Sequence, residues 1–136
     1  MIEDQVSQAE TSAGPDCILV AEDDASVRRL NAEALAGSGY RVDAAEDGAV
    51  AWDSLQSKAY RLLITDNNMP RMSGLELIRR MRTARMTTPV ILVSSAIPEA
   101  ALDLHSPLHI DATLPKPYCV TDLLKMVSEV LVTRRV

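Results

Sequence analysis

Short apolar runs alternate with longer segments of mixed polarity along most of this chain. Each run is about five residues long, which is typical of a strand buried on both faces of a sheet. The run Leu62, Leu63 and Ile64 ends in Thr65 and Asp66, before a Met-Pro step that cannot continue a central strand. The predicted strands are Cys17–Ala21, Arg41–Ala45, Arg61–Thr65, Val90–Ser94 and Ile110–Leu114.

The segments between these runs place apolar residues at three- and four-residue steps, as one face of a helix does. In the first segment Val27, Leu30, Ala34 and Leu35 form such a stripe, and we expect all four to pack in the core. The predicted helices are Ala25–Ser38, Gly48–Lys58, Ser73–Ala84, Glu99–His105 and Thr121–Val132.

Five strands in strict alternation with five helices predict an α/β fold. Right-handed crossovers then give a doubly wound, five-stranded parallel (βα)5 sheet of the flavodoxin-like kind, with helices on both faces. Residues 1–16 are polar and end in a Gly14-Pro15 break, so we expect a flexible N-terminal tail followed by one domain over residues 17–136.

Composition and charge exclude some classes of function but do not identify one. The 19 acidic and 14 basic residues give a net charge of -5, and without a basic block we expect no direct contact with nucleic acid. No apolar run approaches the ~20 residues of a membrane span, so we expect a cytoplasmic protein with no membrane insertion. Cys17 and Cys119 lack metal-ligand spacing and are predicted to be small buried residues.

Candidate chemistry gathers where the predicted strands end. Glu22 and Asp23 follow the first strand, Asp66 follows the third, Ser94 ends the fourth, and Lys116 follows the fifth. The carboxyl ends of parallel strands share one edge of the sheet, which is where open α/β sheets bind ligands. We therefore expect these acids, the hydroxyl and the lysine to converge on Asp66.

Clustered carboxylates need a cation or raised pKa values to persist. A few hard oxygen ligands with open positions for water and phosphate favour Mg2+ over a closed calcium cage. The segment from Asp66 is no EF-hand, because Arg71 and Leu77 stand where such a loop needs Gly and Glu. An aspartate nucleophile remains: Asp66 can accept a phosphoryl group in line, with Lys116 balancing charge and Ser94 donating a hydrogen bond.

Four stretches resemble the receiver domain of bacterial two-component response regulators, of the stand-alone type that chemotaxis receivers represent. They are ILVAEDD, LLITDNNMPRMSG, PVILVSSA and LPKPY. The resemblance implies Asp66 as phosphoacceptor, Ser94 as switch hydroxyl and Lys116 as the charge partner of the phosphate. It also implies that Mg2+ is the cofactor, and the implied metal ligands are Glu22, Asp23, Asp66 and the backbone carbonyl of Asn68.

The same resemblance implies partners. The donor would be a sensor histidine kinase or a histidine phosphotransfer protein, and the phosphorylated form would change its contacts with an unknown protein target. A homodimer through the fourth and fifth helices is a further expectation. We expect no enzyme activity apart from self-catalysed phosphoryl transfer and autodephosphorylation. Whether the chain is a stand-alone receiver, a relay intermediate or a piece of a longer protein stays open.

Two other classes stay open as alternatives. An aspartyl-nucleophile phosphatase of the haloacid dehalogenase type usually needs a second acid where this chain has Asn68. An interaction module that works without phosphorylation is suggested by Thr113, which stands where the receiver family often has an aromatic switch residue.

Overall fold

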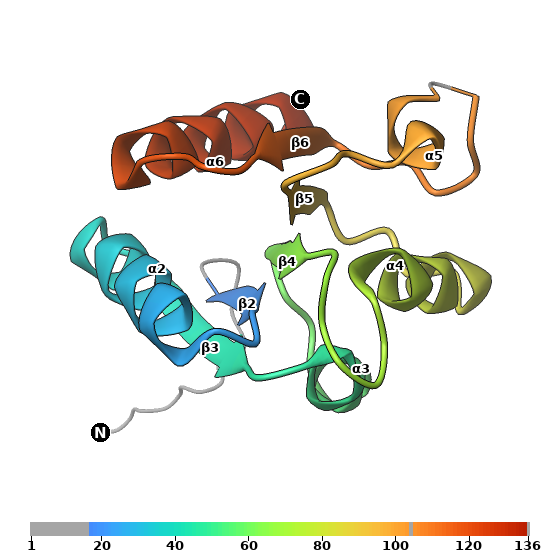
Figure 1. Ribbon diagram of the computed structural model, residues 1–136, viewed down its shortest axis with the longest axis horizontal. Coiled ribbons are helices and arrows are strands. Elements are labelled where there is room, and N and C mark those ends of the chain that lie inside the picture. The colour runs from blue at the N-terminus through green and yellow to red at the C-terminus, as the bar shows by residue number, and fades with distance from the viewer. Residues whose placement is uncertain (1–16, 104, 136) are drawn as a thin grey trace.

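The computed structural model contains one parallel sheet of five strands with helices packed on both faces (Figure 1). It describes residues 17–103 and 105–135, so the predicted tail over residues 1–16 lies outside the described residues. The strand order is β3-β2-β4-β5-β6, and every neighbouring pair is parallel. The predicted fold class is confirmed.

All five predicted strands form, and three have the predicted bounds. The third includes Asp66 as its last residue. The fifth joins the sheet two residues later than predicted, after His109 has turned the backbone with a φ of 50°. The strands are β2 (Cys17–Ala21), β3 (Arg41–Ala45), β4 (Leu62–Asp66), β5 (Val90–Ser94) and β6 (Ala112–Pro115).

The helices also follow the predicted order. They are α2 (Ala25–Gly37), α3 (Gly48–Ser57), α4 (Gly74–Thr83), α5 (Glu99–Leu102) and α6 (Val120–Arg135). In the described parts of the chain, no helix combines the length and the apolar character needed to cross a bilayer.

Helix α5 ends earlier than the predicted His105. Its N-cap, Pro98, makes no side-chain cap hydrogen bond. The segment that follows is bonded to α4 instead, because the Arg82 guanidinium donates to the carbonyl oxygens of Leu108 at 2.7 Å and His109 at 3.0 Å. Within the predicted helix, the His105 amide donates to Oδ1 of Asp103 at 2.9 Å in a local turn, so the prediction that the helix reaches His105 was wrong.

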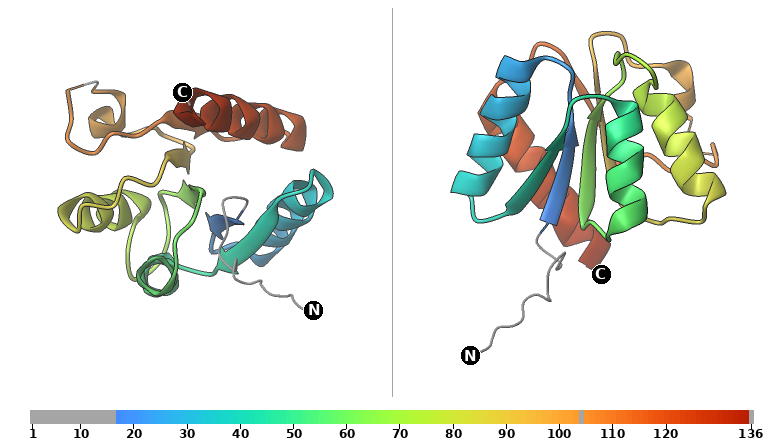
Figure 2. Two further views of the ribbon diagram at one scale, coloured as in Figure 1. Left: turned by 180° about the vertical axis from the view of Figure 1, so that it is seen from behind. Right: turned by 90° about the horizontal axis from the view of Figure 1, so that it is seen from below.

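Two apolar clusters fill the space between the sheet and its helices. Helices α2 and α6 cover one face, and α3, α4 and α5 cover the other, as the views in Figures 1 and 2 agree. Strands β2, β4 and β5 are buried along their whole length. The period-two pattern of each strand divides its side chains between the two clusters, which fixes the register of the sheet.

Two predictions about burial were wrong. Leu30 is 54% exposed, because the buried face of α2 runs through Asn31 and Leu35, about 100° around the helix from Leu30. Cys119 is exposed, whereas Cys17 is buried as predicted.

Gly74 allows α4 to begin directly beside the end of β4. A Cβ atom at this position would lie 2.5 Å from the carbonyl oxygen of Asp66 and 2.9 Å from Cα of Asn67. Both are backbone atoms, so a larger residue would push the loop away from the sheet.

We expect Gly74→Ala to lower the free energy of unfolding by about 1–3 kcal/mol, because the added methyl group displaces backbone. Gly37→Ala is the matched control, since a Cβ at the end of α2 meets nothing within 4 Å. That control should gain about 0.5–1 kcal/mol from the lower entropy of its unfolded chain. Urea denaturation measures both, and equal effects of the two substitutions would contradict the close approach.

Candidate functional site

Three carboxylates meet at the carboxyl-end edge of the sheet. Glu22 follows β2 and Asp66 ends β4, and each is 3% exposed, whereas Asp23 is exposed. One carboxylate oxygen from each of the three lies within 4.8 Å of the other two. The structure therefore brings together the acids that the sequence places on two separate strand ends.

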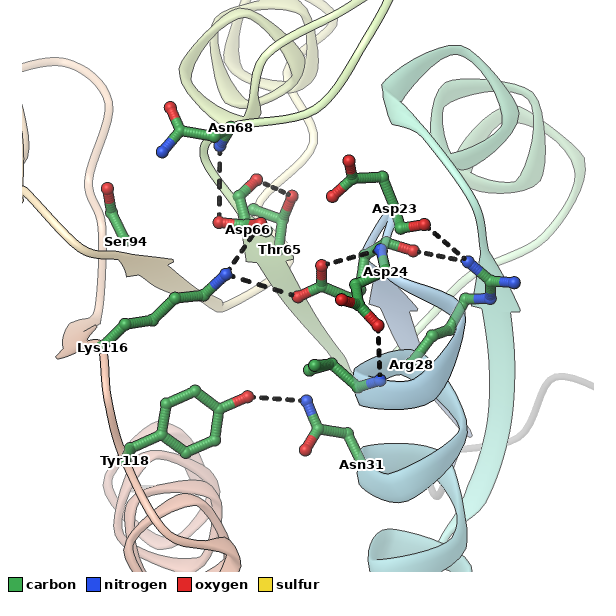
Figure 3. Close-up of polar contacts among 12 residues, drawn as sticks. Asp23, Asp24, Arg28, Asn31, Thr65, Asp66, Asn68, Ser94, Lys116 and Tyr118 are labelled. Carbon is green, nitrogen blue, oxygen red and sulfur yellow. Dashed lines mark hydrogen bonds and ion pairs between the residues drawn. The ribbon is translucent and has the colours of Figure 1, made fainter.

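Lys116 reaches these acids from the end of β6. Its Nζ lies 3.0 Å from Oδ2 of Asp66 and 3.8 Å from Oε1 of Glu22 (Figure 3). Burial alone lowers the pKa of Lys116, but the hydrogen bond to Asp66 and the charges of Glu22 and Asp66 outweigh burial and raise that pKa. The ammonium group thus stays charged and holds the two buried carboxylates together.

One lysine does not neutralise the cluster. Burial raises the pKa of Glu22 to about 7, and the nearby charge of Asp66 adds to this, although the Asp24 amide and Lys116 oppose it. The carboxyl group of Glu22 therefore resists ionisation mainly because it is buried, and its neighbours do not fully compensate for the loss of solvent. The site has the oxygen donors and the charge that suit a hard divalent cation such as Mg2+.

The turn that carries Glu22 and Asp23 is fixed by the start of α2. Asp24 caps this helix, because its Oδ1 accepts the amides of Ser26 at 2.9 Å and of Val27 at 3.1 Å. One turn later, the Arg28 guanidinium donates to the backbone carbonyl oxygen of Glu22 at 2.9 Å. Arg28 was not among the predicted site residues, because no sequence pattern indicates that its side chain folds back on this turn.

The loop between β4 and α4 is held on both sides of Asn68. Next to it, Asn67 Oδ1 accepts the Leu75 amide at 3.0 Å. The Asn68 side chain is exposed, and the backbone amide of Asn68 donates to Oδ1 of Asp66 at 3.4 Å (Figure 3). This places the Asn68 backbone at the rim of the acidic cluster.

The far side of this loop is tied to α3 by an ion pair that the sequence analysis missed. Arg71, which has a φ of 68°, donates from Nε at 3.0 Å and from Nη2 at 2.5 Å to Oδ2 of Asp47. Asp47 also caps α3 by accepting the Val50 amide, and this bond, followed by Arg71, holds the pKa of Asp47 below its ordinary value. The pair spans 24 residues, so no local pattern indicated it.

Ser94 is buried at the end of β5, but its hydroxyl forms a local turn. Oγ donates to the carbonyl oxygen of Ala96 at 3.0 Å and accepts the Ala96 amide at 3.2 Å. In Figure 3 the Ser94 side chain is drawn with no contact to Asp66 or Lys116. The expected hydrogen bond to a group on Asp66 would require this hydroxyl to turn.

The raised pKa of Glu22 predicts the pH dependence of stability in metal-free protein. Between about 4.5 and about 7 the folded state retains a proton that the unfolded chain has lost, so stability falls as pH rises through this window. Glu22→Gln removes this penalty. We expect the variant, in EDTA, to be more stable than wild type at pH 8 and to lose that advantage towards pH 4.

Urea denaturation at a series of pH values measures this difference. Asp103→Asn, on the loop after α5, is a control that removes an exposed carboxylate away from the cluster. A wild type more stable than Glu22→Gln at pH 8 would contradict the raised pKa of Glu22.

Comparison with known proteins supports the resemblance to receiver domains. The family model for the response regulator receiver domain matches residues 18–128. The receiver protein CpdR of Brucella abortus is 35% identical over 116 residues, covering 85% of this chain and 96% of CpdR. The transcriptional regulatory protein TctD of Salmonella typhimurium is 36% identical and is matched over 47% of its own length. This chain thus spans about half of TctD.

Solved structures show the same fold. The chemotaxis protein CheY4 of Vibrio cholerae superposes with a TM-score of 0.76 at 27% identity, over 84% of this chain and 97% of CheY4. The response regulator TrrA of Thermotoga maritima, solved in complex with Mg2+ and BeF, has a TM-score of 0.73 at 31% identity, over 85% of this chain and 98% of TrrA. The resemblance stated from four short stretches is confirmed, and this chain belongs to the response regulator receiver domain family.

Proposed function

We propose that this protein is a phosphoacceptor in a two-component phosphorelay and that Asp66 takes the phosphoryl group. The contact that supports this best is the buried carboxylate of Asp66 at the end of β4, with the Lys116 ammonium 3.0 Å away and two further acids beside it. The donor would be a phosphohistidine on a sensor histidine kinase or a histidine phosphotransfer protein. The whole domain would span residues 17–136, slightly more than the matched 18–128.

The proposed cofactor is Mg2+, held by Glu22, Asp23, Asp66 and the backbone carbonyl of Asn68. The oxygen donors and the raised pKa of Glu22 fit such an ion. When bound, Mg2+ would offset negative charge on the phosphoryl oxygens and on the acids that surround them. A related receiver, TrrA, was solved with Mg2+ and BeF, which is consistent with this assignment.

In the proposed transfer, one carboxylate oxygen of Asp66 attacks phosphorus in line. The new oxygen–phosphorus bond forms as the phosphorus–nitrogen bond to the donor imidazole breaks, and the imidazole leaves with that electron pair and takes a proton. The Lys116 ammonium would then bond to a phosphoryl oxygen in place of the Asp66 carboxylate, because the negative charge moves from the carboxylate to the phosphoryl group. Attack of water on phosphorus then releases phosphate and restores Asp66.

The switch would begin at Ser94. A phosphoryl group adds about -1.5 to -2 of charge, which favours rotation of the Ser94 hydroxyl away from Ala96 and towards a phosphoryl oxygen. The loop after β5 would follow it and change contacts with a protein target that the sequence does not name. Thr113 on β6 offers no aromatic ring to report this movement, so the changed surface would differ from that of receivers with an aromatic residue there.

Two further expectations from the sequence belong to this proposal. One is a cytoplasmic location, and the other is a homodimer formed through the fourth and fifth helices, here α5 and α6. The small size of α5, four residues, makes this surface differ from the one that the sequence predicts.

Beryllofluoride, a phosphoryl mimic, tests the proposal without a partner kinase. With Mg2+ present, we expect amide chemical shifts to change around Asp66, Ser94 and Lys116 in an NMR titration. Asp66→Asn should abolish these changes, because the amide cannot form the acyl-phosphate-like bond. Asp111→Asn, at the opposite edge of the sheet, is the matched control and should respond as wild type does.

A wild-type protein that shows no Mg2+-dependent response would contradict phosphoacceptor function. The chain would then be better described as an interaction module that works without phosphorylation. A response that persists unchanged in Asp66→Asn would place the binding site elsewhere.

A further inference from the structure

A polar pair, formed by buried Asn31 and half-buried Tyr118, lies beneath the acidic cluster. Asn31, on the inner face of α2, is 3% exposed, and its Nδ2 donates to the hydroxyl oxygen of Tyr118 at 2.7 Å. Figure 3 shows the two side chains meeting below Lys116, one from each side of the site. The pair joins parts of the chain that are 87 residues apart.

The polar character of Asn31 needs an explanation. Its neighbour one turn along α2, Leu35, is fully buried in the apolar cluster between the sheet and α6. A buried amide costs free energy unless it is hydrogen-bonded, and an apolar side chain of similar size would fill the same space without that risk. Such a pair therefore fixes geometry more than it adds stability.

Packing alone does not hold the Tyr118 ring in place. An open groove of about 530 Å3 runs beside it, and Val27 and Leu30 also line this groove. Leu30 is exposed, so the ring has space to move towards solvent. The hydrogen bond to Asn31 is the directional contact that keeps Tyr118 against α2.

The position of Tyr118 affects Lys116, which lies two residues earlier. On one side, the Lys116 amide donates to the carbonyl oxygen of Ser94 at 3.0 Å, which anchors the segment to β5. On the other side, Tyr118 anchors it to α2 through Asn31. Helix α2 begins at the turn that carries Glu22, so the pair fixes how far Lys116 stands from that acid, here 3.8 Å.

We propose that Asn31 and Tyr118 are positioning residues that hold the Lys116 ammonium where it meets a phosphoryl group on Asp66. This inference rests on the proposed phosphoacceptor function. It assigns the pair an effect on phosphoryl binding that is separate from metal binding, because Lys116 is not among the proposed metal ligands.

The test uses three variants of the full chain: Tyr118→Phe, Asn31→Leu and the double variant. Beryllofluoride affinity at saturating Mg2+ should weaken about fivefold or more in each, since Lys116 loses a fixed position for a charge-assisted contact. Mg2+ affinity, measured by calorimetry without beryllofluoride, should stay within about twofold of wild type because no carboxylate ligand moves. The double variant replaces the polar pair by an apolar one, so it should regain stability but not beryllofluoride affinity.

Tyr60→Phe is the matched control. Tyr60 is buried, whereas Tyr118 is half-buried, and the Tyr60 hydroxyl likewise makes a hydrogen bond, donating to Asp43 at 2.6 Å near the amino end of β4, away from Asp66. We expect this control to lose stability without losing beryllofluoride affinity.

The outcomes separate the inference from the function on which it rests. If wild type binds no beryllofluoride, the proposed function fails. If wild type binds it and the three variants bind equally well, the positioning role is wrong while the function stands. The positioning role is also wrong if Tyr60→Phe weakens binding as much as Tyr118→Phe, or if the double variant recovers full affinity.

Discussion

The contact between Lys116 and Asp66 is the one on which the site depends. β5 separates β4 from β6 in the sheet, so Lys116 must cross the end of β5 to reach Asp66 at 3.0 Å. Without this cation, two buried carboxylates would face each other in a poorly solvated pocket, and at least one would take up a proton. The remaining excess of negative charge suits a divalent metal ion, which under the proposed function would bind before the phosphoryl group arrives.

Hydrogen bonds outside the pocket hold the backbone segments that carry the acidic residues. Arg28 holds the backbone beneath Glu22, and Asp24 joins the same turn to α2. The ion pair between Arg71 and Asp47 fixes the loop on the opposite side. These contacts restrict the backbone that carries the acids, so the acids can stay close together without each needing a partner of its own.

The sequence predicted the strands, the helices and the edge of the sheet that carries the site. It could do so because apolar runs can be recognised locally and their alternation with helices implies a parallel sheet. It predicted the convergence of Glu22, Asp66 and Lys116 for the same reason, since strand ends share an edge. It failed where long-range contacts decide the outcome. The segment after α5 is held to α4 by the Arg82 guanidinium, and the buried positions of α2 are Asn31 and Leu35 rather than Leu30. No local sequence pattern indicated that Asn31 pairs with Tyr118.

The most direct measurement is chemical identification of the modified residue. The protein would be incubated with acetyl phosphate and Mg2+, and the acyl phosphate would be trapped by borohydride reduction and located by peptide mass spectrometry. The account predicts reduction at Asp66 alone, dependent on Mg2+ and on the phosphodonor. No reduced residue, or reduction at Glu22 or Asp23 in place of Asp66, would contradict it.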